Sequence, residues 1–324
     1  ALVGLVLVLA GGAVGAVGAA RLVRGTRWRV RIPVIAGLVV AAGLVLPTVA
    51  VAVAATHVPA TEVGPMGAAG ARMGLRDVRF RTSDGVVLAA WYAPGTNGAG
   101  VVLRHGSGST RSSVLGPAEV LARHGYAVLL VDARGHGDSD GRAMDLGWSG
   151  ERDVAASVTY LRRRPGVEPG RIAVLGMSMG GEEAIGAAGV DDRIAAVVAE
   201  GATGRTAADD AWLSDEYGWR GWVQERVEDV KTALVDLLAD ARRPASLRAS
   251  VAAAAPRPVL LVAAGDVADE ASAGRFIRSG SPATVQLWVV PGAGHTGGLR
   301  AAPAAWERRV VGFLDAALLD GTSG

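Results

Sequence analysis

Residues 171–189 read RIAVLGMSMGGEEAIGAAG, and this stretch decides the fold. Its first part, RIAVL, is an apolar run typical of a buried strand, and its last part is rich in the small residues that let a helix pack closely. Between the two parts, Gly176 to Gly180 match the pattern G-x-S-x-G. In this pattern a serine lies at a sharp turn from strand to helix, where the glycines keep side chains out of a crowded backbone. The stretch therefore predicts a strand, a tight turn carrying Ser178, and a helix.

Apolar runs of strand character recur along the chain, and segments of helical length separate most of them. Continuous apolar strands with helical crossovers indicate an α/β fold with a mostly parallel sheet covered on both faces. An antiparallel hairpin is expected first, at residues 75–94, with its turn at 83–85. The further strands are expected at residues 100–106, 126–133, 171–178, 194–202, 258–265 and 284–292, and helices between them at 113–124, 150–163 and 180–189.

The segment at residues 203–255 is too long for an ordinary crossover between two strands. Its apolar residues recur at helical spacing, with aromatic residues ahead of them, which favours a helical cap inserted over the sheet edge. The apolar residues are Val223, Val227, Val230, Leu234, Leu237 and Leu238, and the aromatic residues are Trp212, Tyr217, Trp219 and Trp222.

The first 56 residues differ in composition from the rest of the chain. Residues 1–20 and 32–56 carry no charged side chain, and each segment has about the 20 residues that a helix needs to cross a bilayer. Residues 21–31 between them contain five arginines, which the positive-inside rule keeps in the cytoplasm. Residues 1–56 thus predict a two-helix membrane anchor that holds the following domain on the extracytoplasmic side of the cell membrane.

Two other interpretations of this region stay open. With an Arg-rich start, an apolar middle and Ala52-Val53-Ala54, residues 21–54 also have the pattern of an export signal. The two apolar segments could instead form a pair of buried core helices. A linker rich in Gly, Ala and Pro is expected at residues 57–74, followed by the main domain at 75–320.

Composition excludes several kinds of chemistry. The chain has no cysteine, which rules out disulfides, cysteine ligands to zinc and a cysteine nucleophile. With 33 basic and 31 acidic residues its net charge is only +2, so no global field favours nucleic acid as a partner. Lys231 does not lie in a P-loop sequence, and the G-x-G-x-x-G pattern at 292–297 lacks the following strand that a dinucleotide fold requires. We expect neither a metal nor a cofactor.

A serine hydroxyl becomes a good nucleophile only when a base takes its proton. Among five histidines, His295 follows the last predicted strand and precedes the last helix, where a loop would hold it at the carboxyl edge of the sheet. His295 is therefore the predicted base. Of the others, His57 falls in the linker and His124 at the end of a helix.

If the order along the chain is serine, acid, histidine, the acid that orients this base lies between Ser178 and His295. After the strand at 258–265, the segment DVADE offers Asp266, Asp269 and Glu270. We favour Asp269, because Asp266 directly follows the strand and can cap the turn, while Glu270 can begin the next helix. Asp266 and Glu270 stay open as alternatives, as does Glu200 at the end of the preceding strand.

Acyl transfer also needs hydrogen-bond donors for the oxyanion that develops on the substrate. The backbone N–H of Met179, directly after the nucleophile, is one predicted donor. The second is expected from the loop HGSGS at residues 105–109, where Ser107 is the candidate.

Four motifs, HGSGS, DARGHGDSDG, GMSMGG and PGAGHTGG, follow one another on alternating strands, and together they resemble the α/β-hydrolase superfamily. The resemblance covers about residues 75–319 and is greatest to the esterase and serine-aminopeptidase-like branches. It implies Ser178 as nucleophile, His295 as base and a carboxylate after the penultimate strand as acid, with His136 of DARGHGDSDG in a structural role. The sequence departs from the family at Glu182 and Glu183, which at a helix start would act as partners of the helix dipole.

The expected function is hydrolysis of a small-molecule carboxylic ester through an acyl-Ser178 intermediate. A peptidase or amidase, a thioesterase and an acyltransferase of the same fold are the alternatives within enzymes. A non-catalytic binding domain of the cell envelope is the alternative from another class.

Overall fold

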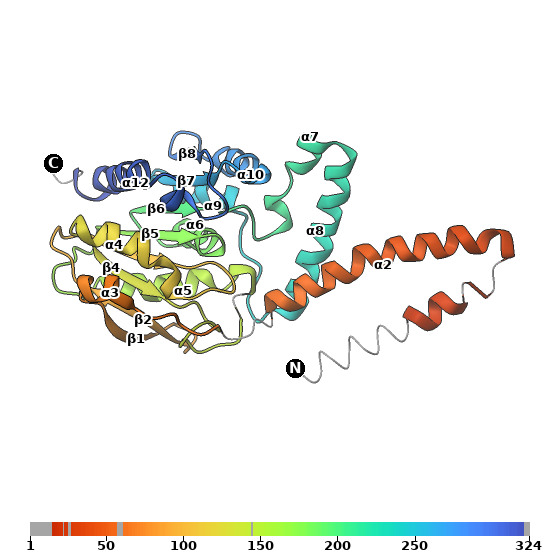
Figure 1. The fold of residues 1–324 in the computed structure, drawn as a ribbon, viewed down its shortest axis with the longest axis horizontal. Helices are drawn as coiled ribbons and strands as arrows, with labels where there is room; N and C mark the ends of the chain where they lie inside the picture. The colour runs from red at the N-terminus through yellow and green to blue at the C-terminus, as the bar shows by residue number, and fades with distance from the viewer. Residues whose placement is uncertain (1–14, 22, 25–26, 57–60, 144, 321–324) are drawn as a thin grey trace. The chain divides into compact units, whose positions relative to one another are not determined.

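The computed structural model describes residues 15–21, 23–24, 27–56, 61–143 and 145–320 (Figure 1). Its contacts divide the chain into two compact units, Ala1–Val51 and Ala52–Gly324. The second unit contains the sheet and every candidate site residue.

The sheet has eight strands in the order β1-β2-β4-β3-β5-β6-β7-β8, which confirms the predicted α/β fold. β1 and β2 form the expected antiparallel hairpin, β2 also pairs antiparallel with β4, and all the remaining pairs are parallel. The strands are β1 Arg76–Arg81, β2 Val87–Ala93, β3 Gly100–Arg104, β4 Ala127–Val131, β5 Ile172–Met177, β6 Ala196–Glu200, β7 Val259–Ala264 and β8 Val285–Val290.

Helices cover both faces of this sheet and divide its core into two apolar layers. α4 and α12 pack on one face, and α5, α6, α9 and α10 pack on the other. Every residue of β3, β4, β5, β6 and β7 is buried, as expected for parallel strands with helices on both sides. These helices are α4 Leu115–Arg123, α5 Gly150–Leu161, α6 Met179–Val190, α9 Leu247–Ala254, α10 Ala268–Arg278 and α12 Pro303–Leu318.

The predicted cap segment is helical, but its parts differ from the expectation. α7 (Leu213–Tyr217) and α8 (Trp219–Leu238) lie outside the helical layers, whereas α9 packs against α6 and belongs to the sheet covering. Of the predicted apolar residues of α8, Val230 and Leu237 are exposed, as are Trp219 and Trp222. The stripe of apolar residues is therefore only partly buried, with Leu234 and Leu238 packed against a small apolar cluster that includes Trp148 and Val235.

The segment predicted as a linker is partly structured. α3 (Gly67–Met73) is a short helix within residues 57–74, and Met66 and Met73 pack against the core. Residues 57–60 lie outside the described part of the chain.

The N-terminal region differs from the predicted membrane hairpin. Most of residues 1–20 lie outside the described part of the chain, and α2 (Trp28–Thr56) begins inside the segment predicted as the Arg-rich loop, so that Arg29 and Arg31 belong to a helix. Among the described residues, no helix has both the length and the apolar character needed to cross a membrane. The structure thus does not support the two predicted transmembrane helices.

Candidate active site

Ser178 lies at the turn between β5 and α6 with φ 53° and ψ −124°. A positive φ is uncommon for a residue with a side chain, and its strain persists only where the surroundings enforce the conformation. Here the Ser178 N–H donates to the carbonyl of Glu200 at 2.7 Å, and the Ser178 carbonyl accepts the N–H of Gly181 at 2.8 Å. The neighbouring backbone thus holds the serine in the sharp turn that the sequence predicts.

The glycines on either side of Ser178 are needed because the backbone crowds them. A β-carbon on Gly176 would lie 2.1 Å from the carbonyl oxygen of Gly180. A β-carbon on Gly180 would lie 2.5 Å from the carbonyl oxygen of His105, the residue directly after β3. Both distances are too short for any side chain, so these positions allow only glycine in this conformation.

His295, in the loop after β8, lies between Ser178 and a carboxylate. Its Nε2 is 2.9 Å from Ser178 Oγ, and its Nδ1 is 2.5 Å from Glu270 Oε1. The imidazole side chain is 50% exposed, so the serine and the histidine are open to solvent on one side. The structure thus brings together a hydroxyl, an imidazole and a carboxylate in the order that proton transfer from the serine requires.

The carboxylate at His295 belongs to Glu270, which corrects the preference for Asp269. Glu270 is 2% exposed, and its second oxygen, Oε2, accepts the N–H of Ala264 at 2.7 Å. Asp269 is exposed on another side of α10 and accepts a hydrogen bond from Tyr217 Oη at 2.5 Å. Neighbouring residues of a helix point about 100° apart, so only one of the two can face His295.

A signal in the sequence could have identified Glu270. It shares a helical face with Ala273, Gly274 and Ile277, all buried, at the spacing i, i+3, i+4 and i+7. A carboxylate on the apolar face of a helix needs a partner, and His295 provides it. Asp266, the other alternative in this segment, is exposed.

Glu200, the fourth carboxylate considered, has a different position. Its two oxygens accept the N–H of Gly298 at 2.7 Å and the indole N–H of Trp306 at 2.9 Å. Burial raises its pKa above the ordinary value. Glu200 therefore anchors the chain just after His295 and makes no hydrogen bond to the imidazole.

The environment of His295 raises its pKa. The main cause is the hydrogen bond to Glu270, and the negative charge of that carboxylate acts in the same direction, while burial opposes both. A more basic imidazole is a better acceptor for the serine proton.

The two predicted oxyanion donors belong to different elements, Met179 to the start of α6 and Ser107 to the loop after β3. Met179 is the first residue of α6, where a backbone N–H has no helical carbonyl to bind. In the loop after β3, Gly106 lies against the serine, because a β-carbon on Gly106 would be 3.1 Å from Ser178 Cβ. Ser107 is exposed beside it. The role of these groups in binding an oxyanion stays a prediction.

The remaining described histidines have structural contacts. His105 is buried, its Nε2 accepts the N–H of Ala133 at 2.9 Å, and burial lowers its pKa to about 3. His136 is also buried and accepts the N–H of Gly108 at 3.2 Å. His124 contacts Glu307 at the surface, and His57 lies outside the described residues.

Glu182 and Glu183, suggested as partners of the helix dipole, lie at the start of α6 and also make specific contacts inside the fold. Both are buried, and burial raises the pKa of each to about 7. Glu182 Oε1 accepts the N–H groups of Thr203 and Gly204 at 3.1 and 3.0 Å. Glu183 pairs with Arg104. Among residues 15–320 as described, no group of three or more His, Asp or Glu side chains is arranged to hold a metal ion.

Comparison with known proteins agrees with this geometry. A family model described as "alpha/beta hydrolase fold" matches residues 101–243. A solved esterase of Pyrococcus furiosus is similar in structure, with a TM-score of 0.64 and 23% sequence identity over 81% of this chain and 98% of that one. The chain therefore has the α/β-hydrolase fold.

Two curated relatives are similar over part of their length. A protein named as a thiohydrolase, from Aspergillus aculeatus, is 36% identical over 127 residues, which are 38% of this chain and 40% of that protein. One named as a polyketide transferase, from Stachybotrys chlorohalonatus, is 38% identical over 128 residues, 38% of this chain and 43% of that protein. The match thus spans about two fifths of each relative. It supports a place in the α/β-hydrolase superfamily.

Proposed function

We propose that this protein is a serine hydrolase that cleaves a carboxylic ester through an acyl-Ser178 intermediate. The observation that carries the proposal is the line of hydrogen bonds from Ser178 Oγ to His295 Nε2, at 2.9 Å, and from His295 Nδ1 to Glu270 Oε1, at 2.5 Å. Other parts of the structure support it, namely the strained serine turn and the position of Met179 at a helix start.

In the first half of the reaction, Ser178 Oγ attacks the carbonyl carbon of the ester. The hydroxyl proton passes to His295 Nε2 as the new C–O bond forms, and Glu270 stabilises the resulting imidazolium. The carbonyl oxygen gains the negative charge, and the N–H of Met179 and a donor from residues 105–108 would stabilise it. His295 then returns the proton to the leaving alkoxide, which departs as the alcohol.

In the second half, a water molecule attacks the acyl-serine. His295 takes one proton from this water, the bond between Ser178 Oγ and the acyl carbon breaks, and the serine regains its proton from the imidazolium. The free carboxylic acid leaves. The half-exposed imidazole is consistent with access of water to this step.

Labelling with a fluorophosphonate tests the nucleophile. Wild-type protein is expected to react covalently, and the Ser178→Ala variant is expected not to react. A panel of chromogenic acyl esters of different chain lengths, with Ser178→Ala as the control, then measures turnover. A folded wild-type protein that neither reacts nor turns over any ester would favour the non-catalytic binding domain instead.

A second candidate is cleavage or transfer of a thioester-bound acyl group. The names of the two curated relatives, thiohydrolase and polyketide transferase, support it. The acyl-serine intermediate is the same, and only the leaving group and the final acceptor differ. Comparing turnover of an ester and a thioester of the same acyl group tests for thioester cleavage. Adding an alcohol tests for acyl transfer, because a transferase would pass the acyl group to the alcohol instead of to water.

The predicted location outside the cytoplasm rests on the sequence of residues 1–56 alone. Because the chain has no cysteine, a single cysteine placed at exposed Arg123 provides a unique label. Reaction with a membrane-impermeant maleimide in intact cells would support an extracytoplasmic domain, and reaction only after lysis would contradict it.

A further inference from the structure

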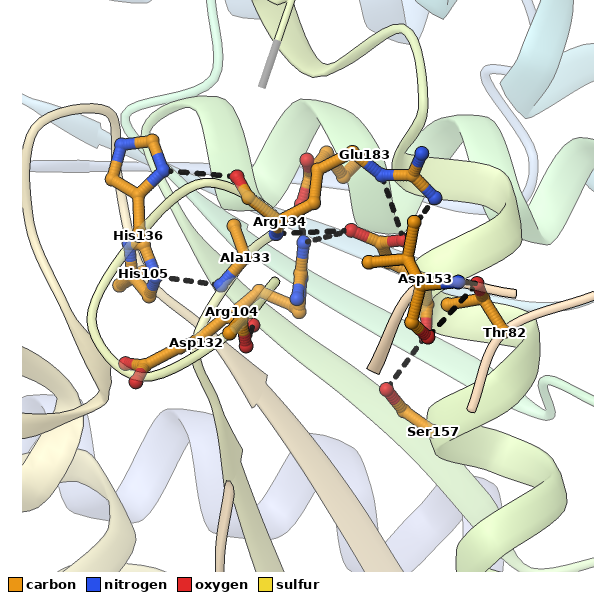
Figure 2. Close-up of polar contacts among 12 residues, drawn as sticks. Thr82, Arg104, His105, Asp132, Ala133, Arg134, His136, Asp153, Ser157 and Glu183 are labelled. Atoms are coloured by element: carbon orange, nitrogen blue, oxygen red, sulfur yellow. Dashed lines mark hydrogen bonds and ion pairs between the residues drawn. The ribbon is translucent and has the colours of Figure 1, made fainter. Parts of the chain in front are cut away.

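A cluster of buried charges lies next to the serine turn, between β3, α5 and α6 (Figure 2). Arg104, Asp153 and Glu183 have side chains almost without solvent exposure, and Arg134 is buried beside them. Buried charges destabilise a fold unless they are paired with good geometry. Their pairing therefore constrains the elements that carry them.

The charges alternate in sign along the cluster. Arg104 Nε and Nη2 donate to Glu183 Oε2 at 2.9 and 2.5 Å, and Nη2 also lies 3.6 Å from Asp153 Oδ2. Asp153 Oδ1 accepts from Arg134 Nε and Nη2 at 3.1 and 2.6 Å. Arg134 Nη1 continues to Asp84 at 2.9 Å. Each buried charge thus has an opposite charge beside it.

The first pair of this cluster joins the two segments that would form the oxyanion site. Arg104 is the last residue of β3, directly before the loop at residues 105–108. Glu183 lies on α6, five residues after Ser178. Between them the backbone is in close contact, since a β-carbon on Gly180 would lie 2.7 Å from the Arg104 carbonyl oxygen.

The far end of the same loop is held from the other side of the cluster. His136 follows Arg134 by two residues and accepts the N–H of Gly108. His105 Nε2 accepts the N–H of Ala133. Both ends of the loop at residues 105–108 are thus fixed by groups next to the buried charges.

The fold also makes room for Glu183. A β-carbon on Gly150, the first residue of α5, would lie 2.3 Å from Glu183 Cγ, and one on Gly147 would lie 3.1 Å away. Glycine at these positions gives the Glu183 side chain its path to Arg104.

We propose that Arg104 and Glu183 form a positioning pair that sets the loop at residues 105–108 relative to Ser178. The proposal rests on the proposed function, in which this loop supplies an oxyanion donor. The two side chains are buried beneath the turn and act through the backbone that they join. Donors to an oxyanion act over fractions of an ångström, and a shift of about 1 Å in a reacting group can lower a rate by about 100-fold.

Two conservative variants test the pair, Glu183→Gln and Arg104→Lys, with Leu161→Ala as the matched control. Glutamine keeps the shape of Glu183 and removes its charge, and lysine keeps the charge of Arg104 and removes its forked geometry. Leu161 is fully buried on α5, the helix that carries Asp153. It packs near Gly100, the first residue of β3, at the other end of this strand from Arg104. It therefore reports the effect of lost stability alone.

The measurements are kcat and KM for a chromogenic ester, the inhibition constant of phenylboronic acid, which forms a tetrahedral adduct on a nucleophilic serine, and the melting temperature. We expect either variant of the pair to lower kcat by about 10- to 100-fold, to weaken the boronate by a similar factor, and to change KM by less than about threefold. Leu161→Ala is expected to lower the melting temperature while kcat and boronate inhibition stay close to wild type.

A folded Glu183→Gln or Arg104→Lys variant that behaves as Leu161→Ala does would overturn the positioning pair. Arg104→Lys keeps a positive charge opposite Glu183. If Glu183→Gln does not fold, Arg104→Lys alone is compared with Leu161→Ala. Fluorophosphonate labelling of the wild type separates this result from a failure of the proposed function. Wild type that does not label overturns both proposals, whereas wild type that labels beside unaffected variants overturns only the positioning pair.

Discussion

His295 uses both ring nitrogens in hydrogen bonds, and in the proposed reaction its protonation sets when Ser178 can react. The hydrogen bond to Glu270 raises the pKa of His295 above the ordinary value of about 6.5. Only the neutral imidazole can accept the Ser178 proton, so kcat/KM should fall as pH decreases through this raised pKa. Glu270→Gln should move the acidic limb of the pH profile to lower pH, which a series of kcat/KM measurements across pH 5 to 9 would check. An unshifted limb would contradict the assignment.

The raised pKa of His295 affects folding stability and activity in opposite directions as the pH changes. Because folding raises the pKa of His295, its charged form is favoured in the folded state. This contribution is fully present below the unfolded pKa of about 6.5 and is lost as pH rises through the folded pKa. Activity and this part of the stability therefore change in opposite directions with pH.

The three carboxylates of DVADE provide a second prediction at the level of single residues. Glu270→Gln should lower kcat by about three to four orders of magnitude, since the buried partner of the imidazole fixes its tautomer and stabilises its charge. Asp266→Asn and Asp269→Asn should stay within a few-fold of wild type, because both side chains are exposed and neither contacts His295. Measuring the turnover of one ester by the three variants identifies which carboxylate is the partner of His295. Loss of activity in Asp269→Asn alone would reverse the assignment.

The turn from β5 to α6 depends on close backbone contact at Gly180. Gly180→Ala would place a β-carbon against the carbonyl groups of Arg104 and His105, so the turn or β3 must shift. We expect a loss of about 1–3 kcal/mol in the free energy of unfolding, together with loss of fluorophosphonate labelling. Gly312→Ala on α12 is the matched control, because nothing lies within 4 Å of its built β-carbon. Equal effects of the two changes would contradict the crowded turn.

The tryptophans of the chain differ in what they contribute to the fold. Trp219 at the start of α8 is 76% exposed, whereas Trp306 on α12 is fully buried and donates its indole N–H to Glu200. Trp219→Ala should change the free energy of unfolding by less than about 0.5 kcal/mol. Trp306→Ala should lower it by about 3–5 kcal/mol. Denaturant unfolding of the two variants checks this, and a large effect of Trp219→Ala would show that α8 packs more closely than described.

At the scale of the whole molecule, the contacts place the sheet and the site in one unit, Ala52–Gly324. A chain comprising these residues should fold, unfold cooperatively and label at Ser178 to the same extent as we expect for the full chain. Circular dichroism during heating and fluorophosphonate labelling would test it. Failure of this chain to fold would show that residues 1–51 contribute to the stability of the second unit.

Local sequence patterns by themselves determined the sheet, the turn carrying Ser178 and the choice of His295. Alternating apolar strands and helices, and the crowding of Gly176 by the nearby Gly180, act over a few residues, so a single sequence shows them. The choice of Glu270 over Asp269 was different, because it depends on which side of α10 faces the loop after β8. The pairing of Arg104 with Glu183 joins residues 79 positions apart. Only the tertiary structure decides such contacts, since they arise where separate elements pack together and bury charges that must then find partners.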